Sequence, residues 1–567
     1  MFTLNAEKFA ARFTSFGVIV ATCLIFSRVS TDPVNLPKFV ALGGLAIGLL
    51  GILIANKPQN IWSKSKLLVI SVGLFVMSLL ISLIGNSAPI SQMIYGAYGR
   101  NTGLLTYLFL AIIFVAISLF NTSNSIKLIL YAFFASALIN IAYCTWVLAF
   151  GDFVGWNNPS GNLLGLFGNP NFISAFLGMF ITGALAFVFA EGTKWNIKIL
   201  ILGLALLSFI EILETKSIQG LVVTVGGSGL VIFYFILTQF KSRIPLMIYS
   251  IFAVVTGVMA IFGALQKGPF DFVYKKSVSL RGTYWKTGIE MGTTNPFNGV
   301  GLDSYGDWYR RARPPIALLD TPGPGITSNA SHNVFIDFFA AGGFPLLVTY
   351  LGLNAIVLFF IIKTTKSLKK FNPHFVALAS AWICYQVQSV ISINQIGLAL
   401  WGWVLGGALI AYSRILIEED APASSAQNKT EKKSSRTVKN EVFTPQLIAG
   451  VGTLIGVLIA LPPLNSDAKW FNAINSTSAV EVEKALQPTF MTPQNSMRYM
   501  QAVNLFATNN LPDLALKYAR AGVEFNPDDF EIWRQFYFLA NATPAEKAVA
   551  LQNMKRLDPL NPDVASN

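Results

Sequence analysis

Residues 104–120 read LLTYLFLAIIFVAISLF, a run of seventeen residues without a charged side chain. An α-helix of about this length and composition can cross the hydrocarbon core of a bilayer. Comparable stretches occur about thirteen times, at 13–26, 40–55, 67–84, 104–120, 128–150, 172–190, 199–213, 221–238, 244–265, 344–362, 375–391, 396–410 and 447–461. The sequence therefore predicts an all-α, polytopic membrane protein.

The composition of the whole chain agrees with this prediction. Of the 567 residues, 53% are hydrophobic and only 12% are charged, against about 25% charged in ordinary soluble domains. These values exclude disordered, collagen-like and disulfide-scaffold classes. The three cysteines all lie in apolar runs, as small buried side chains do. With only two histidines in the chain, a multi-histidine metal site is not expected.

Basic residues predict how the chain is oriented in the membrane. If the N-terminus is cytoplasmic, the segments inside hold twenty Lys and Arg residues, and the short outer loops hold only Arg28, Lys38, Arg100 and Lys216. Cytoplasmic segments of membrane proteins carry such an excess. The net charge of +13 belongs to the membrane part, because residues 465–567 carry nine basic and eleven acidic residues. We therefore expect contact with anionic head groups or phosphates, and no nucleic acid.

Four regions follow from these patterns. Residues 1–415 form a polytopic domain, which includes a long extracytoplasmic loop at 266–332, and such long loops are commonly functional. Residues 416–442 are rich in Ser, Ala and Lys and predict a cytoplasmic linker. Residues 443–464 predict one extra transmembrane helix, and residues 465–567 a small extracytoplasmic domain.

The C-terminal region contains a repeat. Pro493, Pro527 and Pro562 follow one another at intervals of 34 and 35 residues, and Asn-Pro-Asp occurs at 526–528 and again at 561–563. A period of 34 with helical spacing of apolar residues is typical of tetratricopeptide repeats. Two interpretations stay open: a groove that binds a protein partner, and a helical hairpin that only caps the membrane domain.

Polar residues at the outer ends of the spans are the candidates for function, because ionisable groups near the bilayer are costly. They form four clusters: GRNTG at 99–103, GNPN at 168–171, ETKSIQG at 214–220, and the long loop. The loop contributes RGTYWKTGIEMGTTNPFNGVGLDSY at 281–305 and SHN at 331–333.

These motifs resemble the O-antigen ligase and O-antigen polymerase superfamily of bacterial envelope glycosyltransferases. The matching features are DPVNLPKF at 32–39 between two spans, GRNTGLLTYL at 99–108, GNPN opening a span, Arg281 and Trp285 ahead of NPFNGVGL at 295–302, and SHN before a helix with a Gly-Gly turn. The resemblance covers roughly residues 13–415. It implies about twelve spans of the glycosyltransferase-C type, and the extra span with a tetratricopeptide-like tail is similar to one branch of the superfamily.

The resemblance implies transfer of a glycan from an undecaprenyl-diphosphate carrier to an acceptor at the outer face of the bacterial cytoplasmic (inner) membrane. It implies His332, the only histidine in a segment expected outside, as the general base. An imidazole suits that role near neutral pH. Arg281, Arg100 and either Lys216 or Gln219 would bind the diphosphate and stabilise the charge on the leaving group. No cofactor is expected.

Each of these residues also has a structural interpretation. His332 would then only begin a helix, Arg281 would pair with Glu290 or Asp303, and Arg100 would anchor a loop at the interface. Asn169 and Asn171 are expected to cap the following helix. For the run Arg310, Arg311 and Arg313 we expect a solvated or head-group-facing surface.

One motif departs from the family pattern. Members typically carry Ser-Arg and a small residue after the seventh span, whereas this chain reads TKSIQG at 215–220. Lys216 or Gln219 would then fill the arginine position, although lysine cannot form the bidentate fork. Lys216 could instead pair with Glu211 or Glu214.

Several functions remain open within the resemblance. The acceptor could be a lipid, a glycan or a protein, so that an O-antigen polymerase or a protein O-oligosaccharyltransferase is an alternative to a ligase. From a different class, a transporter of lipid-linked glycans is possible, although such proteins tend to show internal repeats and interrupted helices. No outer loop carries a DxD-like pair for a divalent metal, so the sequence predicts a metal-independent mechanism.

Overall fold

The computed structural model describes residues 4–56, 61–155, 158, 160–268, 276–319, 323–419, 445–476 and 478–565. The elements of these residues are helices, without a strand among them. Nine of these helices are long and apolar enough to cross a membrane. The prediction of an all-α, polytopic membrane protein is therefore confirmed.

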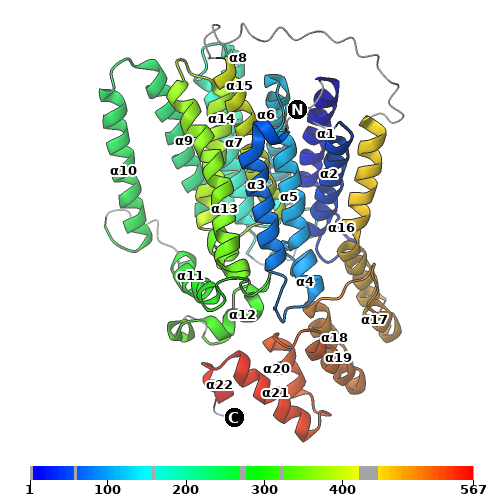
Figure 1. The fold of residues 1–567 in the computed structure, drawn as a ribbon. Helices are drawn as coiled ribbons and strands as arrows, with labels where there is room; N and C mark the ends of the chain where they lie inside the picture. Colours follow the sequence, from blue (N-terminus) through cyan, green and yellow to red (C-terminus); the bar gives the residue numbers. More distant parts are fainter. Residues whose placement is uncertain are drawn as a thin grey trace.

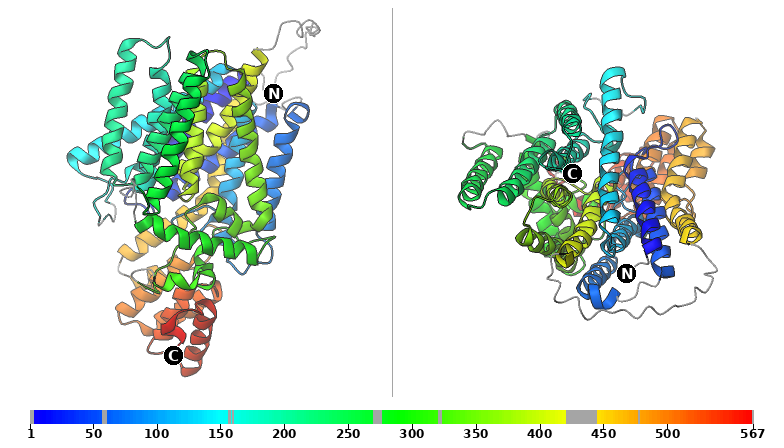
Figure 2. Two further views of the ribbon diagram at one scale, coloured as in Figure 1. Left: turned by 90° about the vertical axis from the view of Figure 1, so that its left-hand side faces the viewer. Right: turned by 90° about the horizontal axis from the view of Figure 1, so that it is seen from above.

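Each of the thirteen predicted spans falls on a helix. These helices are α1 (Leu4–Cys23), α2 (Asn35–Asn56), α3 (Ile61–Ile81), α5 (Leu104–Ser118), α6 (Ser123–Phe150), α7 (Pro170–Val188), α8 (Trp195–Glu214), α9 (Ile218–Gln239), α10 (Ile244–Ala264), α13 (Val334–Ser367), α14 (Pro373–Val390), α15 (Ile396–Glu419) and α16 (Pro445–Asn475). They form an elongated bundle (Figures 1 and 2). The apolar window of α15 is completely buried and that of α10 not at all, so α15 lies in the core and α10 at the edge.

Small residues hold α16 against the N-terminal part of the bundle. A Cβ placed on Gly43 of α2 would lie 2.8 Å from both the Gly456 carbonyl oxygen and the Ala460 Cβ of α16. Membrane helices approach this closely where glycine and alanine line the contact. After crossing, α16 continues to Asn475, so one helix connects the last span directly to the C-terminal region.

The predicted long loop is largely structured and lies at the end of the bundle opposite the N-terminus. It contains α11 (Lys276–Thr294), α12 (Tyr305–Ala312) and a short 3-10 helix, Pro315–Leu319. The C-terminal helices lie beyond α12 at the same end (Figure 1). They are α17 (Ala479–Ala485), α18 (Ser496–Thr508), α19 (Pro512–Phe525), α20 (Phe530–Phe538), α21 (Pro544–Leu557) and α22 (Pro562–Ala565).

The C-terminal helices share a separate hydrophobic core. The hairpins α18–α19 and α20–α21 begin 34 residues apart, at Ser496 and Phe530, which matches the period in the sequence. That the region is a tetratricopeptide-like domain with a protein partner stays a prediction.

The prediction for Arg310, Arg311 and Arg313 is wrong. Arg310 and Arg313 are 7% and 2% exposed. Their guanidinium groups lie 3.0 and 2.7 Å from the carboxylate of Asp558, and Arg311 lies 3.2 Å from that of Asp528. The C-terminal hairpins thus cover this run, and acidic residues more than 200 positions away neutralise it. The local sequence shows a cluster of positive charges, but it does not indicate that the C-terminal hairpins bury this cluster.

A second buried ion pair fixes the base of the C-terminal region. Arg498 of α18 pairs with Asp467 in the C-terminal part of α16 and donates to Thr31 Oγ1 at 3.0 Å. Its guanidinium also lies over the ring of Tyr98, 4.5 Å from the centroid. Removing one partner of a buried pair would leave an uncompensated charge, so the loss of either Arg498 or Asp467 should destabilise this contact between α18 and α16.

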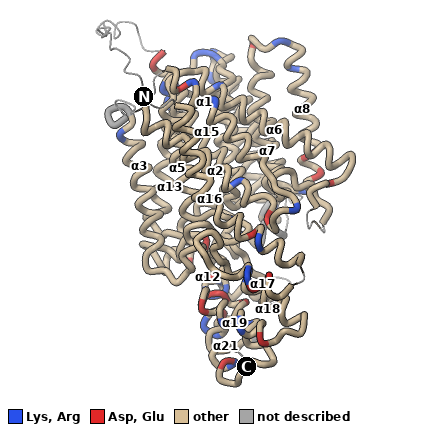
Figure 3. The backbone as a smooth tube through the Cα atoms, turned by 90° about the vertical axis from the view of Figure 1, so that its right-hand side faces the viewer, with Lys and Arg blue, Asp and Glu red and all other residues tan. Residues whose placement is uncertain are grey.

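Charged residues are distributed unevenly along the molecule. Figure 3 shows basic residues gathered at the end that carries the N-terminus, a middle almost without charge, and both signs in the C-terminal region.

We expect a reporter that is active only outside the cell to be active when fused after Asn567 and silent when inserted at Ser424. Alkaline phosphatase activity of the two fusions measures this, and the reverse pattern would contradict the assignment of the outer face.

Candidate functional site

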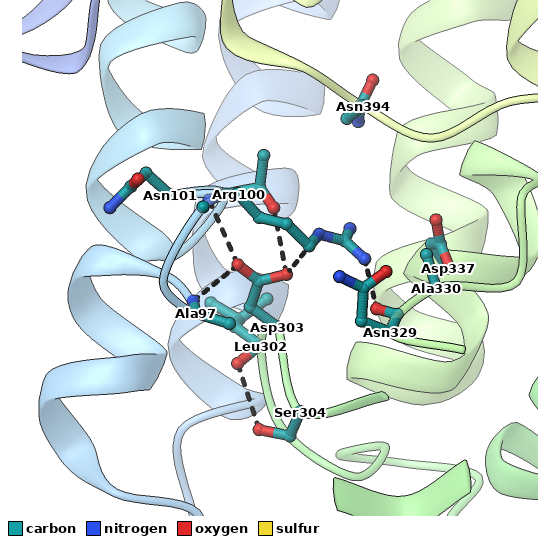
Figure 4. A network of polar contacts seen from close by, with 12 residues as sticks. Ala97, Arg100, Asn101, Leu302, Asp303, Ser304, Asn329, Ala330, Asp337 and Asn394 are labelled. Carbon is teal, nitrogen blue, oxygen red and sulfur yellow. Dashed lines mark hydrogen bonds and ion pairs between the residues drawn. The ribbon is translucent and has the colours of Figure 1, made fainter. Parts of the chain in front are cut away.

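The loop between α4 (Ile90–Tyr95) and α5 presents Arg100 to the long loop. Gly96 has a φ of 91°, and a Cβ on Gly103 would come within 2.5 Å of the Gly96 nitrogen, so the loop closes on itself only with glycine at these positions. The Arg100 Nε lies 3.1 Å from Asp303 Oδ1, and its guanidinium also donates to the Asn329 carbonyl oxygen (Figure 4). Arg100 is only 8% exposed.

Asp303 is the acceptor that joins the two loops. Besides Arg100, its carboxylate accepts from the Ala97 nitrogen at 2.8 Å, the Thr102 nitrogen at 3.2 Å and the Thr102 hydroxyl at 3.0 Å. These donors and Arg100 together engage both oxygens of the Asp303 carboxylate within the protein. Asp303 therefore fixes Arg100, and raises the pKa of that guanidinium above its ordinary value despite burial.

His332 lies in a tight turn ahead of α13. Its φ is 55°, in the left-handed region. On either side, the Ser331 hydroxyl donates to the Asn333 carbonyl at 2.8 Å, and the Asn333 side chain caps α13 by accepting from the Phe335 nitrogen. The Ser331 nitrogen donates to Asp337 Oδ1 at 2.7 Å, from the first turn of the same helix. These bonds fix the backbone on both sides of the imidazole.

Helix α11 packs across the start of α13 and brings its own residues to this turn. A Cβ on Gly288 would lie 2.6 Å from a side-chain atom of Ile336, so the two helices are in close contact there. Tyr284 stacks on His332, with the ring centroids 5.5 Å apart and the planes at 29°. Arg281 lies three residues earlier on α11 and is 8% exposed.

Arg281 has no carboxylate partner among the described residues. The partners considered from the sequence are engaged elsewhere: Asp303 with Arg100, and Glu290 with the Thr294 hydroxyl. Burial lowers the pKa of the Arg281 guanidinium, which still remains charged near neutral pH. The site therefore contains a buried cation with no carboxylate counter-ion among the described residues, and such a group favours the approach of an anion.

The environment keeps His332 neutral. Burial is the larger cause, and the positive charges of Arg281 and Arg100 add to it, so that the pKa of the imidazole falls from 6.5 to about 4. A neutral ring at pH 7 can accept a proton.

A small cavity of about 30 Å³ lies beside these groups, lined by Arg100, Thr102, Tyr107, Leu302, Asp303, Tyr305, Asp337, Phe338 and Ala341. This is room for one or two water molecules. The second carboxylate oxygen of Asp337 is buried, with no hydrogen-bond partner among the residues that the structure describes.

Lys216 and Gln219 lie at the corner between α8 and α9. Lys216 has a φ of 56° and is exposed. Gln219 is 1% exposed, and its Nε2 donates to the Ile391 carbonyl oxygen at 3.2 Å. Ser217 caps α9 and donates to Asn171 Oδ1 at 2.7 Å, which joins the GNPN and TKSIQG clusters. Asn169 caps α7, as predicted. Asn171 was also expected to cap this helix, but it lies within the first turn and its side chain accepts from Ser217 instead.

The segment between α14 and α15 connects this corner to the loop of Arg100. Ile391 accepts from Gln219 at one end, and at the other Gln395 donates to Asn35, which itself donates to the Gly99 carbonyl oxygen at 2.8 Å. The charges of Arg281 and Arg100 both act on His332. Gln219 is linked to the loop of Arg100 through residues 391–395 and Asn35.

Asp337, Tyr284 and residues 391–395 belong to or border this site but were not among the candidates predicted from the sequence. Asp337 follows SHN by four residues in the first turn of the predicted helix, where an acidic residue is also an ordinary helix-start feature. Tyr284 lies three residues after Arg281, on the same face of α11. This spacing is the sequence feature that could have indicated that the two side chains belong to one site.

Comparison with known families completes the description of the site. Residues 174–351 match the family model described as O-antigen ligase. The matched range includes Lys216, Gln219, Arg281 and His332, and leaves Arg100 outside. No curated protein matches the chain. The chain is thus a multi-pass membrane protein that contains, at residues 174–351, a domain similar to O-antigen ligases, which supports a glycan-transfer function.

Proposed function

We propose that this protein transfers a glycan from an undecaprenyl-diphosphate carrier to an acceptor at the outer face of the cytoplasmic membrane. One observation carries the proposal: Arg281, a buried guanidinium without a counter-ion among the described residues, lies on the helix whose Tyr284 stacks on His332. A phosphate anion is the partner that such a cation lacks, and a neutral imidazole is the base that such a reaction needs.

In the proposed reaction, the acceptor hydroxyl attacks the anomeric carbon of the donor glycan. His332 takes the hydroxyl proton while the new C–O bond forms. The bond between the anomeric carbon and the diphosphate oxygen breaks, and undecaprenyl diphosphate leaves with the electron pair. Arg281 stabilises the charge that develops on the leaving oxygen, with Lys216 or Gln219 as a further contact. Asp303 and Asn329 hold Arg100, so we give Arg100 a positioning role as well as the predicted substrate contact.

The acceptor is not identified by these residues. An O-antigen or polysaccharide polymerase and a protein O-oligosaccharyltransferase use the same donor chemistry and would need the same base and cation. The lipid-linked glycan transporter is less well supported, because Arg100, Arg281 and His332 act on one another in a single cluster.

The pH dependence of transfer tests the state of His332. The neutral ring is the reactive form, and it predominates above its pKa of about 4. We therefore expect kcat/KM to stay nearly constant from pH 7 down to about 5 and to fall toward pH 4. The diphosphate diester remains ionised throughout. An acid limb near pH 6.5 would show instead an imidazole of ordinary pKa, and no acid limb above pH 3 would exclude His332 as the base.

Reconstitution tests the reaction itself. Purified protein, supplied with a synthetic undecaprenyl-diphosphate glycan and an acceptor, should form product and release undecaprenyl diphosphate, and we expect EDTA to leave the rate unchanged. Mass spectrometry of both products measures this. Activity lost to EDTA and restored by Mg²⁺ or Mn²⁺ would overturn the metal-independent mechanism. Movement of intact donor across a vesicle membrane without bond cleavage would favour a transporter.

A further inference from the structure

A large cavity opens at the end of the bundle opposite the candidate site. Its volume is about 960 Å³, within the range of small-molecule sites. It is enclosed by the start of α6, the α7–α8 connection, the end of α9, the α13–α14 connection and the last turns of α15. The orientation predicted from the sequence places this end in the cytoplasm. Nothing in the proposed transfer reaction uses it.

Most of the charged residues that line this cavity are cations. Lys127, Lys369 and Lys370 line it, against one carboxylate, that of Glu191. Phe187, Leu368 and Phe371 add apolar wall. An excess of positive charge beside apolar surface fits a phosphate group at the edge of the bilayer.

A buried hydroxyl provides a second, independent observation. Thr364 lines the cavity and is 1% exposed. Its Oγ1 has no hydrogen-bond partner among the described residues, although threonine in a helix usually donates to the carbonyl of the preceding turn. Nearby, Asn372 Oδ1 accepts from the Phe375 nitrogen at 3.1 Å and from the Tyr412 hydroxyl at 3.4 Å, so the rim is fixed by its own bonds. A buried hydroxyl without a partner among the described residues, in a cavity that three lysines also line, is suited to an oxygen-rich anion.

We propose that this cavity binds a phosphate anion, carried either by the head group of an anionic membrane lipid or by a small soluble phosphate. Lysine suits this role as a mobile point charge at the rim, and the Thr364 hydroxyl would supply a fixed contact deeper in the cavity. The proposal is independent of the glycan-transfer function, which concerns the other end of the bundle.

Binding to the purified full-length protein in a non-ionic detergent tests the proposal. Phosphatidylglycerol binding is followed by native mass spectrometry, and inorganic phosphate binding by titration calorimetry. The variant K127Q/K369Q/K370Q should bind roughly tenfold to a hundredfold more weakly than the unmodified protein. The matched control K194Q/K198Q/K241Q removes three lysines from the same end, outside the cavity, and should change affinity less than about twofold.

Thr364→Val provides a test that leaves the charge unchanged. It removes the hydroxyl at nearly constant volume and should weaken binding about tenfold or more, as expected for the loss of one hydrogen bond to a charged group. Binding of the lipid alone identifies the head group as the source, whereas binding of both probes shows that free phosphate suffices. The proposal is overturned if neither probe binds, or if the control lysines lower affinity as much as the cavity lysines.

Discussion

Replacing His332 by Asn should abolish glycan transfer, with a loss of about 10²–10⁴-fold in rate, because a general base contributes that much. Asparagine is the appropriate substitute, since His332 has a φ of 55° and asparagine tolerates left-handed backbone better than most residues. The turn should therefore keep its shape while the proton acceptor is removed. Initial rates with the synthetic donor measure the effect. His332→Ala should lose at least as much activity.

A matched control separates lost chemistry from lost structure. Asn510 also lies in left-handed backbone, at a φ of 56°, in the C-terminal region away from the site. Asn510→Ala should leave the transfer rate within about twofold. Both proteins should elute as single species of equal size. If His332→Asn retains full activity in a well-folded protein, His332 is only a turn residue and the base lies elsewhere.

Arg281 should be required for its geometry as well as its charge. Arg281→Gln should lower the transfer rate by about 10²–10³-fold, as loss of one strong donor to a transition-state anion does. Arg281→Lys should still lose about tenfold, because an ammonium group cannot form two parallel N–H···O contacts with phosphate oxygens. Donor saturation curves give kcat and KM for each variant.

Lys286 is the control on the same helix, exposed to solvent one turn from Arg281. Lys286→Gln should change neither constant by more than about twofold. If Arg281→Lys behaves like the unmodified protein, the guanidinium is not a bidentate diphosphate contact. A loss of stability in Arg281→Gln, with unchanged kcat in the folded fraction, would give Arg281 a structural role only.

Lys216 and Gln219 are the two candidates for the position at which the resembling family typically carries an arginine. If Lys216 fills it, Lys216→Arg should be tolerated and Lys216→Ala should weaken donor use. If Gln219 fills it, Gln219→Ala should do more damage. Gln219 is buried with its Oε1 unpartnered among the described residues, and Lys216 is exposed, so the comparison also distinguishes a group inside the bundle from one at its edge.

Much of the architecture follows from short-range sequence properties. Apolar runs of sufficient length specify helices one at a time, because every backbone polar group in a bilayer has to be bonded within its own segment. Caps are equally local: Asn169 binds a nitrogen two residues away and could be predicted from the GNPN motif. The long loop at 266–332 could also be predicted from local sequence, because it lacks an apolar run long enough to span the membrane.

By itself, then, the sequence determined the helical membrane class, the positions of the spans and the candidate residues His332, Arg281, Arg100, Lys216 and Gln219. Only the tertiary structure decided how these residues are partnered. It paired Arg100 with Asp303, 203 positions away, left Arg281 without a carboxylate among the described residues, and buried Arg310 and Arg313 against Asp558. The physical reason is that ion pairs depend on distances of 3–4 Å between side chains, and helix packing sets those distances independently of separation along the chain.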